Sequence, residues 1–145
     1  MGALILPRSG PVYADASVFI YSVEKHLQFG PVLRPLWQAA AVGNITVVTS
    51  ELTVLETLVG PIRANNRDLV EDYERLFHLP SIETVPISLT ELREAARLRA
   101  MIPTLRTPDA IHAATAQVLG CRMFLTNDAG FRRVASLPVT VLKDL

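Results

Sequence analysis

The feature that most constrains the fold is a β-rich run that ends at a small polar or acidic residue and continues as a helix. Residues 11–21 (PVYADASVFIY) show it first, because an apolar run leads to Asp15 and then to Ser17, a candidate helix N-cap. Residues 45–49 (ITVVT) show it again, leading through Ser50 into a helix over residues 51–59. In parallel α/β sheets such turns lie at the carboxyl edge, where ligands bind.

The rest of the chain continues this alternation of strands and helices. We expect further strands at residues 82–85, 123–126 and 139–142, and helices at residues 32–42, 67–79, 89–101, 108–119 and 129–135. Alternating elements predict an α/β fold, a three-layer α/β/α sandwich around a central, mainly parallel sheet of four to five strands. At 145 residues the chain fits a single domain over residues 1–145.

Several helix ends are marked by capping and breaking residues. Ser88 and Glu91 have the spacing of a capping box, and Thr107 is expected to cap a helix that begins at Pro108. The Gly-Pro pairs at residues 30–31 and 60–61 are expected to interrupt the chain.

The composition narrows the class of protein. Lysine plus arginine and aspartate plus glutamate number 14 each, so no overall basic field attracts nucleic acid, and any such binding must be local. One cysteine excludes an internal disulfide and a cysteine zinc site. With no apolar run long enough for a membrane span, the sequence predicts a cytoplasmic protein. A hydrophobic fraction of 50% indicates either a generous core or apolar surface covered by a partner or a second copy.

Four of the acidic residues stand apart from the solvated helix faces. Asp15 ends the first strand, and Glu56 lies in an otherwise apolar helical stretch, where a carboxylate needs a buried partner or a water-filled cleft. Asp109 falls in the first turn of an alanine-rich helix, and Asp128 follows the strand at residues 123–126. Taken singly, the helix dipole accounts for Asp109 and an ordinary turn for Asp128.

Together, the four acids predict a metal site. Two carboxylates ~4 Å apart repel by about 4 kcal/mol at an effective dielectric of 20, and a divalent cation reverses that sign. Oxygen ligands suit Mg²⁺ or Mn²⁺ rather than zinc. Candidate residues that orient water around such a site are Ser17, Thr126 and Asn127. His112, one turn after Asp109, is better explained by packing or by support of the site than by catalysis.

Four segments, VYADASVFIY, TSELTVLETL, LRTPDAIHAATA and FLTNDAGFRRV, resemble in order and spacing the acidic motifs of the PIN-domain nucleases, and most closely those of VapC-type ribonuclease toxins. The resemblance covers essentially the whole chain. It implies a Rossmann-like sandwich, metal binding by Asp15, Glu56, Asp109 and Asp128, and metal-dependent cleavage of RNA. It also implies a homodimer and a cognate antitoxin protein that blocks the cleft.

The sequence thus favours a metal-dependent endoribonuclease, with Arg106, Arg132 and Arg133 as candidate contacts to the RNA backbone. One alternative is a phosphoacceptor domain like a response-regulator receiver, which needs a lysine near the last strand, where only Lys143 is present. Another is a catalytically silent binding module that holds a partner at the sheet edge.

Overall fold

The computed structural model describes residues 2–145. In chain order the elements are β1 (Pro11–Ala14), α1 (Ala16–Val23), α2 (Phe29–Ala41), β2 (Thr46–Ser50), α3 (Glu51–Arg63), α4 (Arg67–Phe77), β3 (Ile82–Val85), α5 (Leu89–Met101), α6 (Thr107–Val118), β4 (Met123–Thr126), the 3-10 helix η1 (Ala129–Arg133), β5 (Val139–Val141) and the 3-10 helix η2 (Leu142–Asp144).

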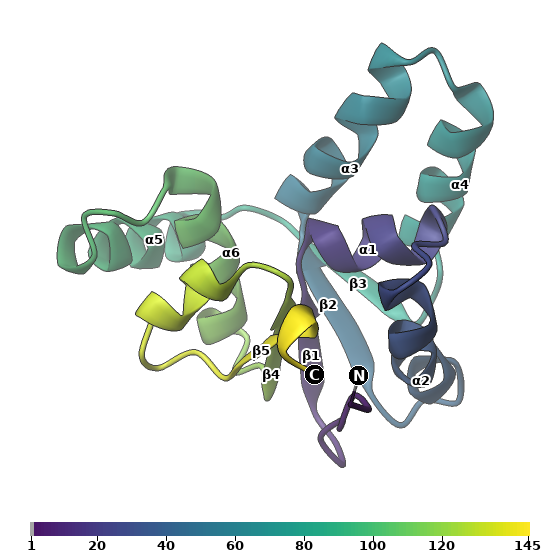
Figure 1. Cartoon of the computed structure of the whole chain (residues 1–145). Helices are drawn as coiled ribbons and strands as arrows, with labels where there is room; N and C mark the ends of the chain where they lie inside the picture. Colours follow the sequence, from purple (N-terminus) through teal and green to yellow (C-terminus); the bar gives the residue numbers. More distant parts are fainter. Residues whose placement is uncertain (1) are drawn as a thin grey trace.

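The five strands form one parallel sheet in the order β3-β2-β1-β4-β5, with β1 at its centre (Figure 1). Tyr13 of β1 is in register with Val48 of β2 and Phe124 of β4. All five strands therefore end at the same edge of the sheet, the carboxyl edge, from which α1, α3 and η1 depart. This confirms the predicted class of fold.

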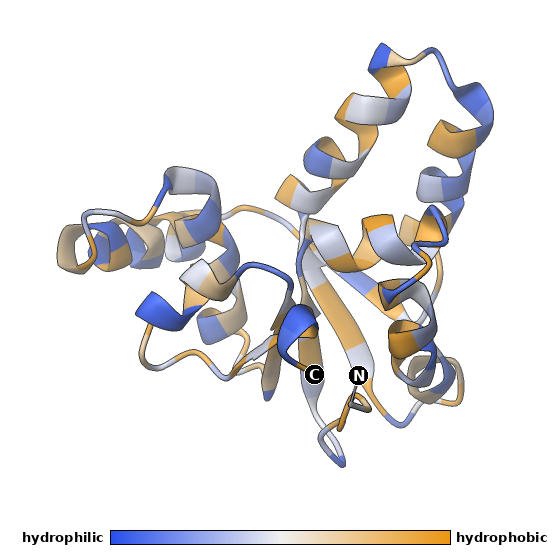
Figure 2. Ribbon diagram, in the orientation of Figure 1, coloured by the Kyte–Doolittle hydropathy of each residue, from blue (hydrophilic) through white to orange (hydrophobic). Residues whose placement is uncertain are grey.

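Each face of the sheet carries its own apolar core, because successive strand side chains point to opposite faces. Val12 and Ala14 pack with α1 and α2 on one face, whereas Tyr13 packs with α5 and α6 on the other. The hydropathy colouring shows apolar strands between two-toned helices (Figure 2). Helices α3 and α4 pack on each other and extend beyond the carboxyl edge (Figure 1).

Most predicted element boundaries hold, and the exceptions concern prolines and caps. Gly30 and Pro31 lie inside the first turn of α2, where a missing backbone N–H leaves no bond unmade, so they do not break the chain. Pro35, which the sequence placed near that first turn, is consequently interior.

The prediction for α3 was too short, because the helix passes through Pro61 and ends at Arg63. Pro61 is buried, and this packing compensates for the helical hydrogen bond that it cannot donate. The N-cap of α6 is Arg106 rather than the expected Thr107, and the helix begins at Thr107 itself. Among residues 2–145, no helix has both the length and the apolar character that crossing a bilayer requires.

Candidate functional site at the carboxyl edge

Asp15 follows the central strand β1 and lies in the middle of the carboxyl edge. It caps α1, in place of the expected Ser17, because its Oδ1 accepts the Ser17 backbone N–H at 3.1 Å. The Ser17 hydroxyl donates to the same oxygen at 2.5 Å, and the Thr126 hydroxyl donates to Oδ2. Thr126 Oγ1 also accepts the Asp128 backbone N–H at 3.0 Å, so one hydroxyl connects the ends of β1 and β4.

The carboxylate of Asp15 is buried without a cationic partner. The residue is only 7% exposed, and none of the salt bridges among residues 2–145 includes it. Burial raises the pKa of Asp15, while the hydrogen bonds from Ser17 and Thr126 oppose that rise. A buried acid that holds only hydroxyl and amide donors is chemically suited to a bound cation.

Glu56 meets the expectation of a buried partner, and the partner is His112. The imidazole Nε2 lies 2.5 Å from Glu56 Oε1, and Nδ1 lies 2.6 Å from the Tyr13 hydroxyl. Tyr13 and His112 are almost completely buried, whereas the Glu56 side chain is 31% exposed. The chain of hydrogen bonds therefore runs from the core below the sheet edge to a carboxylate at the surface.

The direction of the bond to Glu56 follows from the carboxylate, which only accepts hydrogen bonds. We therefore assign a ring proton to Nε2 of His112, which donates to Glu56. On the other side of the ring, the Tyr13 oxygen accepts the Ser50 backbone N–H at 3.1 Å and is hydrogen-bonded to His112 Nδ1. Burial raises the pKa of Tyr13. The sequence indicated packing or support for His112, but it gave no sign of the Tyr13 contact, which spans 99 positions.

Asp109 and Asp128 differ in exposure, because the Asp109 side chain is 13% exposed, less than that of Glu56, whereas Asp128 is exposed. Asp109 Oδ2 accepts from Arg106 Nε at 3.1 Å, and the arginine side chain is 74% exposed. Asp128 is exposed and caps η1 through a 2.8 Å bond from Gly130 N to its Oδ1. Asp128 is connected to Asp15 through Thr126, which bonds both residues, and Asp109 is three residues before His112 on α6.

The other residues proposed from the sequence have varied surroundings. Asn127 donates from Nδ2 to the Tyr21 hydroxyl at 3.0 Å and accepts the Lys143 backbone N–H, so its amide links loops rather than acids. Arg132 pairs with Asp144 at 2.6 Å, and Arg133 donates to Thr104 Oγ1 and to a backbone carbonyl.

The donor set fits a hard divalent cation in its chemistry, since all four proposed ligands are carboxylates. The four carboxylates do not surround a common point in the described part of the chain. Within the described part of the chain, no three aspartate, glutamate, histidine or cysteine side chains converge as in a preassembled metal site. The bonds to His112 and Arg106 each engage one oxygen of Glu56 and of Asp109, respectively.

Fold and site together define a Rossmann-like α/β domain with an acidic edge beyond β1 and β4. Three solved structures share this fold. They are VapBC2 from Rickettsia felis bound to a promoter DNA fragment (TM-score 0.75, 16% identity, 90% of this chain and 98% of that one), FitAcB from Neisseria gonorrhoeae (0.72, 23%, 92% and 99%), and VapBC-5 from Mycobacterium tuberculosis (0.60, 24%, 94% and 98%).

The sequence itself gives the family. Residues 12–137 match the PIN domain, a stretch that runs from β1 to the loop between η1 and β5 and includes all four acids. The chain belongs to the PIN-domain family. No curated protein matches it significantly in sequence.

Proposed function

We propose that this protein is a metal-dependent endoribonuclease and the toxin of a toxin-antitoxin module. The observation that carries the proposal is Asp15, a buried carboxylate without a cationic partner at the carboxyl edge of a parallel sheet. Membership of the PIN-domain family and the likeness to toxin-antitoxin complexes such as VapBC-5 support it. We expect the protein to act in the cytoplasm.

The proposed ligands of Mg²⁺ or Mn²⁺ are Asp15, Glu56, Asp109 and Asp128. When bound, the cation offsets the charge of these carboxylates and lowers the barrier to attack of water on a phosphodiester. Ser17 and Thr126 hold the Asp15 carboxylate in a fixed orientation, one hydroxyl on each oxygen.

His112 has a positioning role in this scheme. Its ring donates to Glu56 and is held from behind by Tyr13, so it restricts the directions in which the Glu56 carboxylate can point. His112 is 2% exposed and does not reach solvent itself, which argues against a direct proton transfer to RNA.

Each of the three arginines proposed as contacts to the RNA backbone already has a partner in the structure. Arg106 lies next to Asp109, and its exposed guanidinium remains the best placed of them. Arg132 and Arg133 are already engaged by Asp144 and Thr104, so an RNA phosphate must compete with these partners.

The proposed protein partners are a cognate antitoxin and a second copy of the chain. Helix α3 exposes an apolar stripe at a helical spacing, formed by Leu55, Val59 and Ile62, which are 60%, 42% and 59% exposed. Leu89 and Leu92 expose a second apolar patch on α5. These surfaces contribute to the exposed apolar area of the chain, and they support the proposed homodimer and antitoxin complex.

The receiver-like alternative lacks a supporting contact. Lys143 follows the last strand, but no salt bridge joins its side chain to a carboxylate among residues 2–145. Family membership also favours the nuclease.

The test is cleavage of a mixed single-stranded and structured RNA substrate with Mg²⁺ or Mn²⁺, compared with the same reaction in a chelator. We expect endonucleolytic products only with metal, and a rate lower by about a hundredfold or more in the Asp15→Asn variant. Cleavage that is insensitive to both changes would rule the proposal out.

A further inference from the structure

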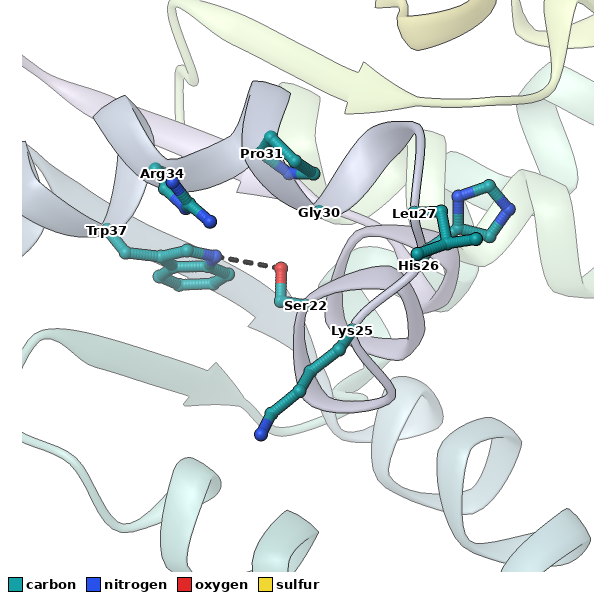
Figure 3. A pocket seen from close by; sticks show the side chains of 8 residues that line it. All are labelled: Ser22, Lys25, His26, Leu27, Gly30, Pro31, Arg34 and Trp37. Atoms are coloured by element: carbon teal, nitrogen blue, oxygen red, sulfur yellow. Dashed lines mark hydrogen bonds between the residues drawn. The ribbon is translucent and has the colours of Figure 1, made fainter.

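A pocket of about 420 Å³ lies at the far end of α1 from Asp15 (Figure 3). The end of α1, the loop that follows and the first part of α2 form it, with the residues Ser22, Lys25, His26, Leu27, Gly30, Pro31, Arg34 and Trp37. None of the four proposed metal ligands lines this pocket, so it is separate from the acidic set.

The charge of the pocket is of one sign. Lys25 and Arg34 are exposed cations, and no acidic residue lines the pocket. Among the described residues, neither cation has a side-chain hydrogen bond or salt bridge, whereas Arg75, Arg97 and Arg132 are paired with acids. In a chain with no net charge, the lining of this pocket is locally positive, which favours an anion.

The aromatic lining is held in place by polar contacts. Trp37, the only tryptophan, donates from Nε1 to Ser22 Oγ at 2.8 Å, and its ring stays partly exposed. His26 Nδ1 lies 3.2 Å from the Phe29 backbone nitrogen and accepts its N–H at the start of α2. Figure 3 shows Lys25 and Arg34 flanking the hydrogen bond between Ser22 and Trp37. An aromatic ring of fixed orientation beside two cations suits a base and its phosphate.

The pocket is connected to the acidic edge through one aromatic residue. The Tyr21 ring packs on His26 with centroids 4.7 Å apart, and its hydroxyl accepts from Asn127, the neighbour of Asp128. Along the other side, the eight residues of α1 separate the pocket from Asp15 by about 12 Å at 1.5 Å per residue. That separation is a span of a few nucleotides.

We propose that this pocket is a subsite for single-stranded RNA, in which Trp37 stacks on a base while Lys25 and Arg34 hold the adjoining phosphates. The inference rests on the proposed ribonuclease function and adds a binding position outside the cleavage centre. An acidic protein segment satisfies the cations but leaves the aromatic surface unused, and so RNA accounts for more of the lining.

The test measures binding in the inactive Asp15→Asn protein, with fluorescence anisotropy of labelled single-stranded RNA across a range of salt concentrations. The variants are Lys25→Gln, Arg34→Gln and Trp37→Leu, with Trp37→Phe as the conservative counterpart. Arg63→Gln, which removes an exposed cation at the end of α3, is the matched control. Thermal unfolding of each variant identifies any that is not folded.

Each variant has its own expected result. Lys25→Gln and Arg34→Gln each reduce the slope of log K against log salt by about 0.7, the loss of one phosphate contact on a single strand. Trp37→Leu weakens binding by about fivefold or more without changing that slope, and Trp37→Phe restores most of the affinity. Arg63→Gln leaves both quantities unchanged.

Two further comparisons separate this inference from the proposed function. If the wild-type protein cleaves RNA with Mg²⁺ and the pocket variants bind and cleave like it, the subsite is wrong and the nuclease stands. If the wild-type protein neither binds nor cleaves RNA, both are wrong. Variants that lose only affinity for the antitoxin, with RNA binding intact, would make the pocket a protein contact and overturn the proposal.

Discussion

The starts of α1 and α5 each hold a carboxylate that is shielded from solvent, and the two behave in opposite ways. Asp15 is 7% exposed and is the N-cap of α1, whereas Glu91 is 5% exposed and belongs to the capping box of α5 as its third residue. Burial raises the pKa of Asp15, whereas hydrogen bonds from Ser88 lower the pKa of Glu91. Ser88 donates its backbone N–H to a Glu91 oxygen, as a capping box requires, and its hydroxyl donates to the same oxygen.

The difference lies in what surrounds each cap. Glu91 belongs to the peripheral helix α5, where desolvation is outweighed by hydrogen bonds. Asp15 lies at the middle strand of the sheet, where its hydroxyl donors do not offset the burial of its charge. The stabilising carboxylate Glu91 and the destabilising carboxylate Asp15 thus look alike in the sequence. A destabilising buried carboxylate is expected where a bound ligand supplies the missing positive charge.

The largest contrast should appear in activity. We expect Asp15→Asn to lower RNA cleavage by about a hundredfold or more, because it removes a charge that acts in the reaction. Glu91→Gln, the matched control, keeps a capping side chain and should leave cleavage within twofold of wild type, about 0.4 kcal/mol in the barrier. Initial rates at saturating Mg²⁺ measure both. A large loss in Glu91→Gln would show that the two caps are not different in kind.

The support of Glu56 gives the next largest effect. His112→Gln should lower cleavage by about 10–100-fold, the usual loss when a partner that orients a metal ligand is removed. The double variant with Glu56→Gln should be no worse than Glu56→Gln alone, because His112 acts only through that carboxylate. The Mg²⁺ concentration for half-maximal rate should rise in His112→Gln. Additive losses in the double variant would instead indicate an independent role for His112.

The capping box predicts a moderate effect on stability. Glu91→Ala removes the acceptor for both Ser88 groups and should cost about 1 kcal/mol, which lowers Tm by about 3 °C in a chain of this size. Asp15→Asn should raise Tm in a chelator, because it removes a buried charge. Differential scanning calorimetry measures the two changes, and a drop for both would remove the contrast between the caps.

The smallest expected effect is the pH dependence of the increase in Tm that Asp15→Asn causes. The pKa of Asp15 is raised above its ordinary value of 3.8, so the folded state resists losing this proton. The penalty is therefore absent below the unfolded pKa and grows as pH rises toward the folded pKa. The Tm of Asp15→Asn should exceed that of wild type more at pH 7.5 than at pH 4, both in a chelator. A gap that narrows as pH rises would contradict the burial argument.

The sequence predicted the architecture well because the relevant signals are local. Strands at residues 82–85 and 123–126, the capping box at Ser88 and the closing glycine at residue 43, with φ of 81°, all depend on a few neighbouring residues. Pro31 and Pro61 were misread because a proline's effect depends on its position within the turn and on what it packs against.

The candidate site was predicted only in part, because its contacts join distant segments. Spacing identified the four acids, but it could not show that Thr126 binds Asp15 across 111 positions or that Tyr13 fixes His112. Nor could the spacing show that Arg106 donates a hydrogen bond to Asp109. The pocket at Trp37 gave no sequence signal, since its lining combines a helix end, a loop and a second helix.

The central claim is that four carboxylates share one hard cation, and crystals soaked in Mn²⁺ test it most directly. Anomalous diffraction should show manganese bound to Asp15 together with at least two of Glu56, Asp109 and Asp128, with Glu56 still hydrogen-bonded to His112. Manganese bound elsewhere, or an Asp15 carboxylate still holding only Ser17 and Thr126 at millimolar Mn²⁺, would contradict the account.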